Sequence, residues 1–270
     1  MTSAPKPREN PQPTLKEEAR TSIQVLRDGE RCKKTYTVPS ILAWRTFLLP
    51  SRGAREYENL RAARESHLPC VAPIEWEETR RWGMVRSSAL TWVFVRGRCL
   101  RQALRQESLS QRERFAVCRG LGDLLRRFHD AGHAWLTAVP RNVILPPEPD
   151  TAPLIACDLP YSLKFRQSIV GRSVARVDLF SMSFSPSRMR EFSARERRFL
   201  LLSYCRGNRD ECRRLLRVLN TRTPRRQRGS QAANRAWFGV VVPTLGRLMR
   251  AFRKLPREAH DRDPSPTHTS

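Results

Sequence analysis

The sequence lacks the features that mark several large protein classes. No apolar run reaches the roughly 18 residues that suggest a membrane-spanning helix, and the first residues, MTSAPKPRENPQPTLKEE, contain no apolar segment like that of a secretory signal peptide. The seven cysteines form no C-x-x-C pair and lie at positions 32, 70, 99, 118, 157, 205 and 212. We therefore expect a cytosolic protein with reduced core cysteines, without a disulfide framework or a cysteine metal site.

Acidic residues are also scarce. Asp and Glu number 26 against 51 Lys and Arg, which gives a net charge of +25 and a pI near 11.3. This excess favours an anionic partner such as a phosphorylated glycolipid, an acidic membrane surface or nucleic acid, although an arginine-rich genome would produce the same excess. Nucleic acid is the least favoured, because most aromatic residues fall at core-like spacing and no recognised nucleic-acid motif is present. The best anion-binding candidates are the clustered Arg222, Arg225, Arg226 and Arg228.

The distribution of residue types predicts an α+β protein of two lobes. Residues 1–20 are rich in proline and charge and read as a disordered tail, and residues 21–96 contain strand-like runs with one helix. Residues 97–255 are mainly helical in pattern, and residues 256–270 read as a second disordered tail. A small β-rich N-terminal lobe would therefore precede a larger helical lobe.

The N-terminal lobe offers a lysine and a glutamate as functional candidates. Two strands, 22–26 and 31–38, flank an Asp-Gly hairpin signal. Lys34, on the second strand, is the better candidate to enter a cleft, although two solvated lysines at 33 and 34 are equally compatible with the pattern. A helix over 51–65 presents Glu56 away from its apolar stripe, and strands over 71–76 and 89–95 are expected to bracket a charged turn, EETRRWG.

Residues 129–158 contain the layout of a kinase-type phosphotransfer site. A capping box formed by Ser110 and Glu113 opens an amphipathic helix that Gly132 ends, and a loop with Asn142 follows. Two apolar runs, VIL and LIAC, then lead to Asp158. In kinases the loop supplies a base Asp and a metal-binding Asn, the Asp after the second strand binds magnesium, and a strand Lys pairs with a helix Glu. Asn142, Asp158, Lys34 and Glu56 fit four of these roles.

The base is missing from this layout. Counting back from Asn142 places Thr137 at the position of the base, and counting from His133 places Trp135 there. No Asp or Glu occurs from residue 131 to 147, and no G-x-G-x-x-G loop precedes Lys34. The pattern thus predicts a kinase-like fold with an altered catalytic loop.

Two features of the helical lobe complete the prediction. Asp178 either anchors the loop before it or caps the helical run that follows it. A second capping box, Ser193 with Glu196, opens another helix, and further helices are expected over 211–219 and 237–252.

The order of these parts over residues 22–220 resembles the lipopolysaccharide kinase family, which phosphorylates Kdo or heptose sugars. The motifs that carry the resemblance are CKKTY, SRGAREYENL, LLRRFHDAG, RNVIL, LIACDL, VDLFSM and FSARERRFLLLSYCRG. It implies a protein-kinase-like fold, the cofactors ATP and Mg²⁺, and a sugar hydroxyl as acceptor at the inner face of the membrane. Lys34 would contact phosphates, Glu56 would pair with it, and Asn142 and Asp158 would bind the metal.

Two functions therefore follow from the sequence. One is a weakly active or inactive lipopolysaccharide-type sugar kinase in which Thr137 stands where the family has its catalytic Asp. The alternative is a non-catalytic pseudokinase that binds an anionic glycolipid, a nucleotide or a protein.

Overall fold

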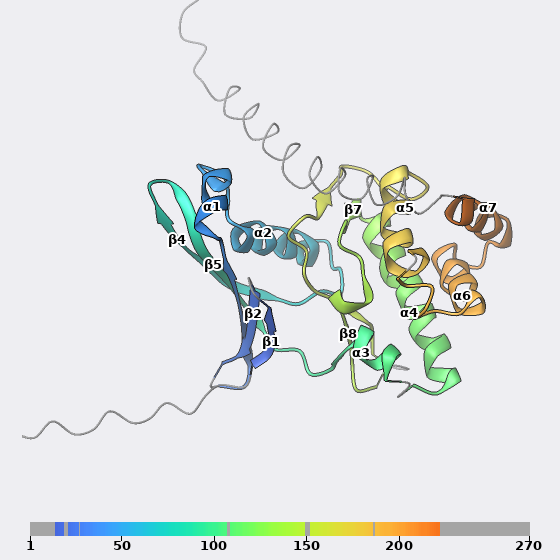
Figure 1. The fold of residues 1–270 in the computed structure, drawn as a ribbon. Helices are drawn as coiled ribbons and strands as arrows, with labels where there is room; N and C mark the ends of the chain where they lie inside the picture. The colour runs from blue at the N-terminus through green and yellow to red at the C-terminus, as the bar shows by residue number, and fades with distance from the viewer. Residues whose placement is uncertain are drawn as a thin grey trace, which may run out of the picture.

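A computed structural model describes residues 14–18, 21–26, 28–106, 109–148, 152–185 and 187–221. In this part of the chain a β-rich N-terminal lobe lies beside a larger helical lobe (Figure 1). The predicted two-lobed α+β fold is therefore confirmed. The arginine cluster at 222–228, the helix expected over 237–252 and the C-terminal tail lie outside the described residues.

The N-terminal lobe is built on an antiparallel sheet of five strands in the order β1-β2-β3-β5-β4. Their bounds are Thr14–Glu18 (β1), Thr21–Val25 (β2), Arg31–Thr37 (β3), Pro73–Arg81 (β4) and Met84–Val93 (β5). Strand β1 falls inside the stretch read as a disordered tail, so that prediction was wrong for these five residues. A proline- and charge-rich composition did not reveal it, because an edge strand needs only one hydrogen-bonded neighbour, here β2.

Two hairpins of this sheet, β2–β3 and β4–β5, differ in how well the sequence predicted them. Asp28-Gly29 forms the expected turn, in which Asp28 Oδ1 accepts hydrogen bonds from the amides of Glu30 and Arg31 and Gly29 adopts a φ of 69°. The predicted turn EETRRWG is instead mostly strand, and only Trp82-Gly83 turns. Strand β4 is an edge strand with mainly exposed side chains, which lets it carry charges without interruption.

Helix α2 (Arg52–Glu65) packs on the sheet. It begins as predicted, because the Ser51 hydroxyl accepts a hydrogen bond from the amide of Ala54 at 3.1 Å. Its buried face includes Ala54, Leu60 and Glu56. The apolar spacing had placed Glu56 on another face, and the structure corrects this because polar partners on the sheet receive the carboxylate.

Between β3 and α2 lie the short α1 (Ser40–Ala43) and the 3-10 turn η1 (Trp44–Thr46). The chain leaves the sheet through Gly97, where an added Cβ would lie 2.5 Å from the carbonyl oxygen of Leu145. Such close backbone approach requires glycine at the junction of the lobes.

The helical lobe surrounds a continuous core centred on α4. Its elements are α3 (Leu100–Arg105), α4 (Gln111–Asp130), η2 (Pro140–Asn142), α5 (Ser173–Leu179), the π-helical turn η3 (Phe180–Phe184), α6 (Ala194–Tyr204) and α7 (Arg209–Thr221). Both predicted capping boxes are present, at the starts of α4 and α6. Within the residues described, no helix combines the length and apolar character needed to cross a bilayer.

Short strands position the loop between the lobes. The small sheets are β6-β8-β9 and β7-β10, and the strands span Arg98–Cys99 (β6), His133–Ala134 (β7), Val143–Leu145 (β8), Ile155–Ala156 (β9) and Leu163–Lys164 (β10). The predicted VIL and LIAC hairpin is therefore real, although its strands are short, and it delivers Asp158 to the gap between the lobes.

Candidate active site

Lys34 enters the gap between the lobes because of the two-residue period of β3. Cys32, Lys34 and Tyr36 point to the buried face, whereas Lys33 is partly exposed and pairs with Glu77. The Lys34 ammonium donates hydrogen bonds to both carboxylate oxygens of Glu56 at 3.2 Å and to Asp158 Oδ1 at 2.6 Å. The structure thus brings together three of the residues selected from the sequence.

Glu56 is the buried partner of this lysine. Its side chain is 2 % exposed, and it also accepts a hydrogen bond from the Tyr36 hydroxyl. Burial raises the pKa of Glu56, and the Lys34 ammonium opposes that rise without cancelling it. Burial acts to lower the pKa of Lys34, but the carboxylates of Glu56 and Asp158 outweigh it, so that this pKa is raised.

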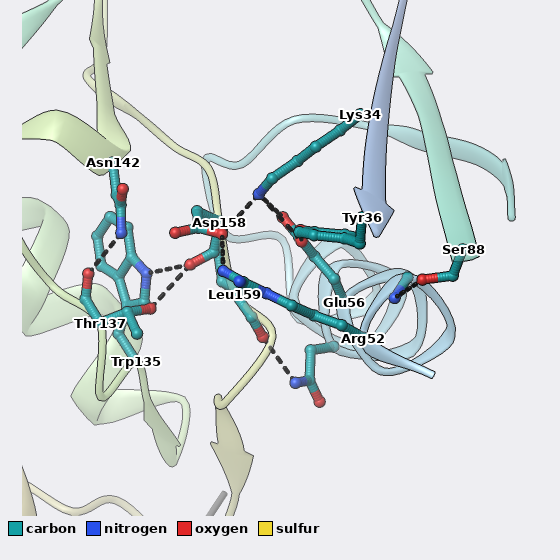
Figure 2. Close-up of polar contacts among 12 residues, drawn as sticks. Lys34, Tyr36, Arg52, Glu56, Ser88, Trp135, Thr137, Asn142, Asp158 and Leu159 are labelled. Carbon is teal, nitrogen blue, oxygen red and sulfur yellow. Dashed lines mark hydrogen bonds and ion pairs between the residues drawn. The ribbon is translucent and has the colours of Figure 1, made fainter. Parts of the chain in front are cut away.

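Asp158 lies where the two lobes meet, as Figure 2 shows. Burial would raise the pKa of its carboxyl, but Lys34 and Arg52 hold it below the ordinary value. The Arg52 guanidinium approaches Asp158 Oδ1 at 3.4 Å and lies over the Tyr36 ring. Asp158 itself has a φ of 61°, which for a non-glycine residue is a strained conformation often found at functional sites.

Asp178 is buried and anchors the turn at Trp135 and Leu136, and it does not cap a helix. It lies within α5, and its carboxylate accepts hydrogen bonds from the backbone amides of Trp135 and Leu136, each at 2.7 Å. His129 Nε2 lies 3.2 Å from the same carboxylate. Leu136 adopts a φ of 61°, so this buried carboxylate stabilises a backbone turn directly before Thr137.

Thr137 faces Asp158 across the loop. Its hydroxyl donates a hydrogen bond to the Asp158 carbonyl oxygen at 2.8 Å, and the Trp135 indole donates to the same oxygen at 3.3 Å. Asn142 is buried, and its amide nitrogen donates to the Thr137 carbonyl oxygen at 2.9 Å. Trp135 is fully buried and its ring stacks on Phe128 in the core, whereas Thr137 is partly exposed.

A cavity of about 170 Å³ opens among these residues. Its polar lining consists of Lys34, Arg52, Glu56, Arg141, Asn142 and Asp158, and its remaining lining is Thr21, Ile23, Val71, Trp92 and Cys157. One wall can thus receive an anion and the other a flat apolar group. Asp158 and Asn142 both supply oxygen atoms of the type that Mg²⁺ prefers.

The donor set fits a magnesium ion that is shared with a nucleotide. The Asn142 amide nitrogen is directed to Thr137, which leaves the amide oxygen on the opposite side (Figure 2). Among the described residues there is no cluster of three or more His, Cys, Asp or Glu side chains suited to a metal. Magnesium is commonly bound by one or two protein oxygens together with phosphates and water, so two protein oxygens are compatible with it.

Arg52, Arg141 and Tyr36 are site residues that the sequence interpretation missed. Arg52 follows the cap of α2 and Arg141 precedes Asn142, so each is adjacent in sequence to a residue already singled out. Proximity to the expected site was the only available signal. The predicted anion-binding residues Arg222, Arg225, Arg226 and Arg228 lie outside the described residues.

Comparison with known proteins identifies the fold. No protein-family model matches the sequence, and curated proteins give no significant match. Among solved structures, "WaaP in complex with acyl carrier protein" is similar over 81 % of this chain and 88 % of that chain, with 15 % identity and a TM-score of 0.56. The bifunctional kinase-methyltransferase WbdD matches over 54 % of this chain and 30 % of that chain, with 16 % identity and a TM-score of 0.41. The likeness to WaaP shows that this chain has the two-lobed, kinase-like fold of the lipopolysaccharide kinases that its motifs resemble.

Proposed function

We propose that this protein binds a magnesium nucleotide between its lobes and slowly transfers a phosphoryl group to a hydroxyl of a lipopolysaccharide-type sugar. The observation that carries the proposal is the buried ion cluster of Lys34, Glu56 and Asp158. A Lys paired with a helix Glu beside a metal-binding Asp is the arrangement that phosphoryl transfer in a kinase-like fold requires.

Each residue has a distinct task in this proposal. Glu56 keeps the Lys34 ammonium directed into the cavity, where it meets a phosphate. Arg52 and Arg141 add positive charge to the same cavity and substitute for the absent glycine-rich loop. Asp158 and Asn142 offer oxygen ligands to magnesium, which would neutralise phosphate charge when bound.

The missing base limits the rate without removing the site. General-base assistance is worth roughly 100- to 10,000-fold, whereas positioning and electrostatic stabilisation provide most of phosphoryl transfer. The Thr137 hydroxyl is not a base at neutral pH and already donates a hydrogen bond to Asp158. We therefore expect slow turnover.

The acceptor and the place of action follow from the resemblance. WaaP is a lipopolysaccharide core heptose kinase, and the structure similar to this chain contains it with acyl carrier protein. A net charge of +25 suits a phosphorylated glycolipid substrate. We place the protein in the cytosol, at the inner face of the membrane where such a substrate is exposed.

A second candidate function is a non-catalytic pseudokinase that binds a nucleotide, an anionic glycolipid or a protein. The observation that favours it is that Asp158 is already paired with two cations, Lys34 and Arg52, while no carboxylate lies on the loop. A site in which the carboxylate is already neutralised by cations of the same protein can bind a ligand without catalysing a reaction.

Thermal unfolding with ATP, with and without Mg²⁺, tests the proposed site. At about a hundredfold excess over the dissociation constant, a bound nucleotide should raise the Tm by roughly 5–10 °C. Asp158→Asn should remove the magnesium-dependent part of the rise, and Asp210→Asn on the exposed end of α7 is the matched control. A wild-type Tm that ATP leaves unchanged contradicts the kinase, and it also contradicts a pseudokinase that binds a nucleotide. A measurement of ATP turnover then separates the enzyme from the pseudokinase. Turnover by the wild type that Asp158→Asn abolishes indicates the enzyme.

A further inference from the structure

Five large apolar side chains are exposed at the outer end of the N-terminal lobe. We call them the apolar tip, and their side chains are 55 to 81 % exposed: Ile41, Trp44, Phe47, Leu48 and Trp82. Four come from the α1–η1 segment and the residues after it, and Trp82 comes from the turn between β4 and β5. Figure 1 shows α1 and the β4–β5 turn together at the end of the sheet, away from helices α4 to α7. Apolar groups gathered at one exposed end mark an interaction surface.

Hydrogen bonds join the two segments that form the apolar tip. The Arg80 guanidinium donates to the carbonyl oxygens of Gly83 and Leu49, each at 2.8 Å. The Val85 amide donates to the Thr46 hydroxyl at 2.9 Å. A Cβ added to Gly83 would lie 2.9 Å from the Phe47 ring, which shows how closely the segments pack. The exposed side chains therefore project from a connected framework.

The backbone of the apolar tip includes two strained residues. Trp82 has a φ of 52° and Leu48 a φ of 53°, a left-handed conformation that bulky residues rarely adopt. The first position of such a two-residue hairpin turn is usually Asn, Asp or Gly. A tryptophan there disfavours the turn and is not explained by core packing, since its side chain is exposed. Strain of this kind points to a function for the side chain.

The charge around the apolar tip is mainly positive, because the Glu78 carboxylate beside it is paired with Arg80. Residues 38–52 and 79–88 contain no Asp or Glu and five arginines, at 45, 52, 80, 81 and 86. The Arg81 guanidinium lies 4.3 Å from the centre of the Trp82 ring, and Arg86 donates to the Ser40 hydroxyl at 3.0 Å. Arg81 and Arg86 thus border the apolar tip, while Arg52 is directed to Asp158. The surface is complementary to an apolar layer bounded by negative charge.

We propose that the apolar tip inserts into the interface of an anionic lipid bilayer. Tryptophan and aliphatic side chains bordered by arginine are the composition of interfacial membrane anchors, in which apolar groups enter the acyl boundary and cations meet acidic headgroups. Aliphatic Ile41 and Leu48 cannot stack on bases, which disfavours nucleic acid. An exposed end bordered mainly by positive charge also differs from the mixed polar rim of protein interfaces. This proposal rests on the proposed location at the inner membrane and adds the surface that would bind the lipid. Lipid binding by this surface requires no nucleotide and no turnover.

Co-sedimentation of the full chain with lipid vesicles tests the proposal. The vesicles are phosphatidylcholine alone and phosphatidylcholine mixed with phosphatidylglycerol. Wild-type protein should bind the anionic vesicles, and the double change Trp44→Ser with Trp82→Asn should weaken binding about tenfold or more, because less apolar surface leaves water. Asn tolerates the positive φ at position 82, so this variant should still fold. Met189→Ser removes an exposed apolar side chain from the other lobe and is the matched control.

Fluorescence quenching separates insertion from adsorption of a protein with a net charge of +25. Lipids brominated on their acyl chains should quench tryptophan emission of the wild type, and the double variant should lose most of this quenching. Arg81→Gln with Arg86→Gln should weaken binding to anionic vesicles, and Asp158→Asn should leave vesicle binding unchanged, which separates this proposal from the nucleotide site. Absence of wild-type binding, absence of quenching, or equal binding by the double variant and the wild type overturns it.

Discussion

The two sides of the cleft at Asp158 differ in what they retain. The N-terminal side holds Lys34 and Glu56 as a buried pair, whereas the loop on the other side, residues 131–147, contains no Asp or Glu. Burial explains the difference. Loss of one member of a buried ion pair leaves the other charge uncompensated, while a catalytic base faces substrate and contributes little to folding.

The loop keeps its conformation without a carboxylate, because other residues hold its backbone. Asp178 fixes the amides of Trp135 and Leu136, and Asn142 fixes the Thr137 carbonyl, through backbone hydrogen bonds that any side chain at 137 permits. The structure of this loop and the presence of a carboxylate on it are thus separable, and the following changes test that separation.

The largest effect is expected from restoring a carboxylate with Thr137→Asp. If the loop is intact apart from its base, ATP turnover should rise roughly 100- to 10,000-fold, the usual contribution of general-base catalysis. The measurement is steady-state ATP hydrolysis with magnesium. Thr137→Val is the control, because it removes the hydroxyl without supplying a base. Unchanged turnover in a Thr137→Asp protein that still binds ATP would contradict the assignment.

The next effect is expected on the buried side of the comparison. Lys34→Met should lower the free energy of unfolding by about 3–5 kcal/mol, because Glu56 would lose its cation. Lys33→Met on the same strand breaks only a more exposed contact with Glu77 and should cost less than about 1 kcal/mol. Urea unfolding of both variants gives the comparison. Equal losses would mean that Lys34 and Glu56 are not a structural pair.

The smallest effect concerns acid and His133, at the start of the loop. Burial, with a smaller contribution from Lys164, lowers the pKa of His133 to about 4. As the pH falls below about 6.5, the unfolded state takes up a proton at His133 before the folded state does. The contribution of His133 to the free energy of unfolding is therefore complete above about pH 6.5 and is lost towards pH 4. The difference amounts to about 3 kcal/mol at most.

Urea unfolding at pH values of about 7 and 5 measures this loss, and His133→Gln should show a smaller decrease between them. His67→Asn, at an exposed position with a φ of 54°, is the control. A His133→Gln protein with the same pH dependence as the wild type would show that the ring is protonated in the folded state.

Short-range signals in the sequence were sufficient for several elements. Asp28-Gly29 formed its hairpin, and the capping boxes of Ser110 with Glu113 and of Ser193 with Glu196 formed their hydrogen bonds. Each of these interactions joins residues at most three positions apart, so neighbouring residues contain the necessary information. Local signals also pointed to Asn142 and Asp158, because these residues lie in a loop and directly after a hairpin that neighbouring residues form.

Longer-range features escaped the sequence interpretation. Glu56 lies on the buried face of α2 although apolar spacing placed it elsewhere, because Lys34 and Tyr36 on β3 receive its carboxylate. Likewise, nothing near Arg52 in sequence indicates that Asp158, 106 residues away, attracts its guanidinium.

The sequence by itself determined the two-lobed α+β class, the two capping boxes, the excess of positive charge and the absence of Asp and Glu from residues 131–147. Only the tertiary structure decided that Lys34 rather than Lys33 enters the cleft, that Trp135 is buried while Thr137 is partly exposed, and that five large apolar residues gather at one exposed end. The physical reason is that local hydrogen bonds and composition are properties of neighbouring residues. Burial and ion pairing depend on segments that meet only when the chain folds.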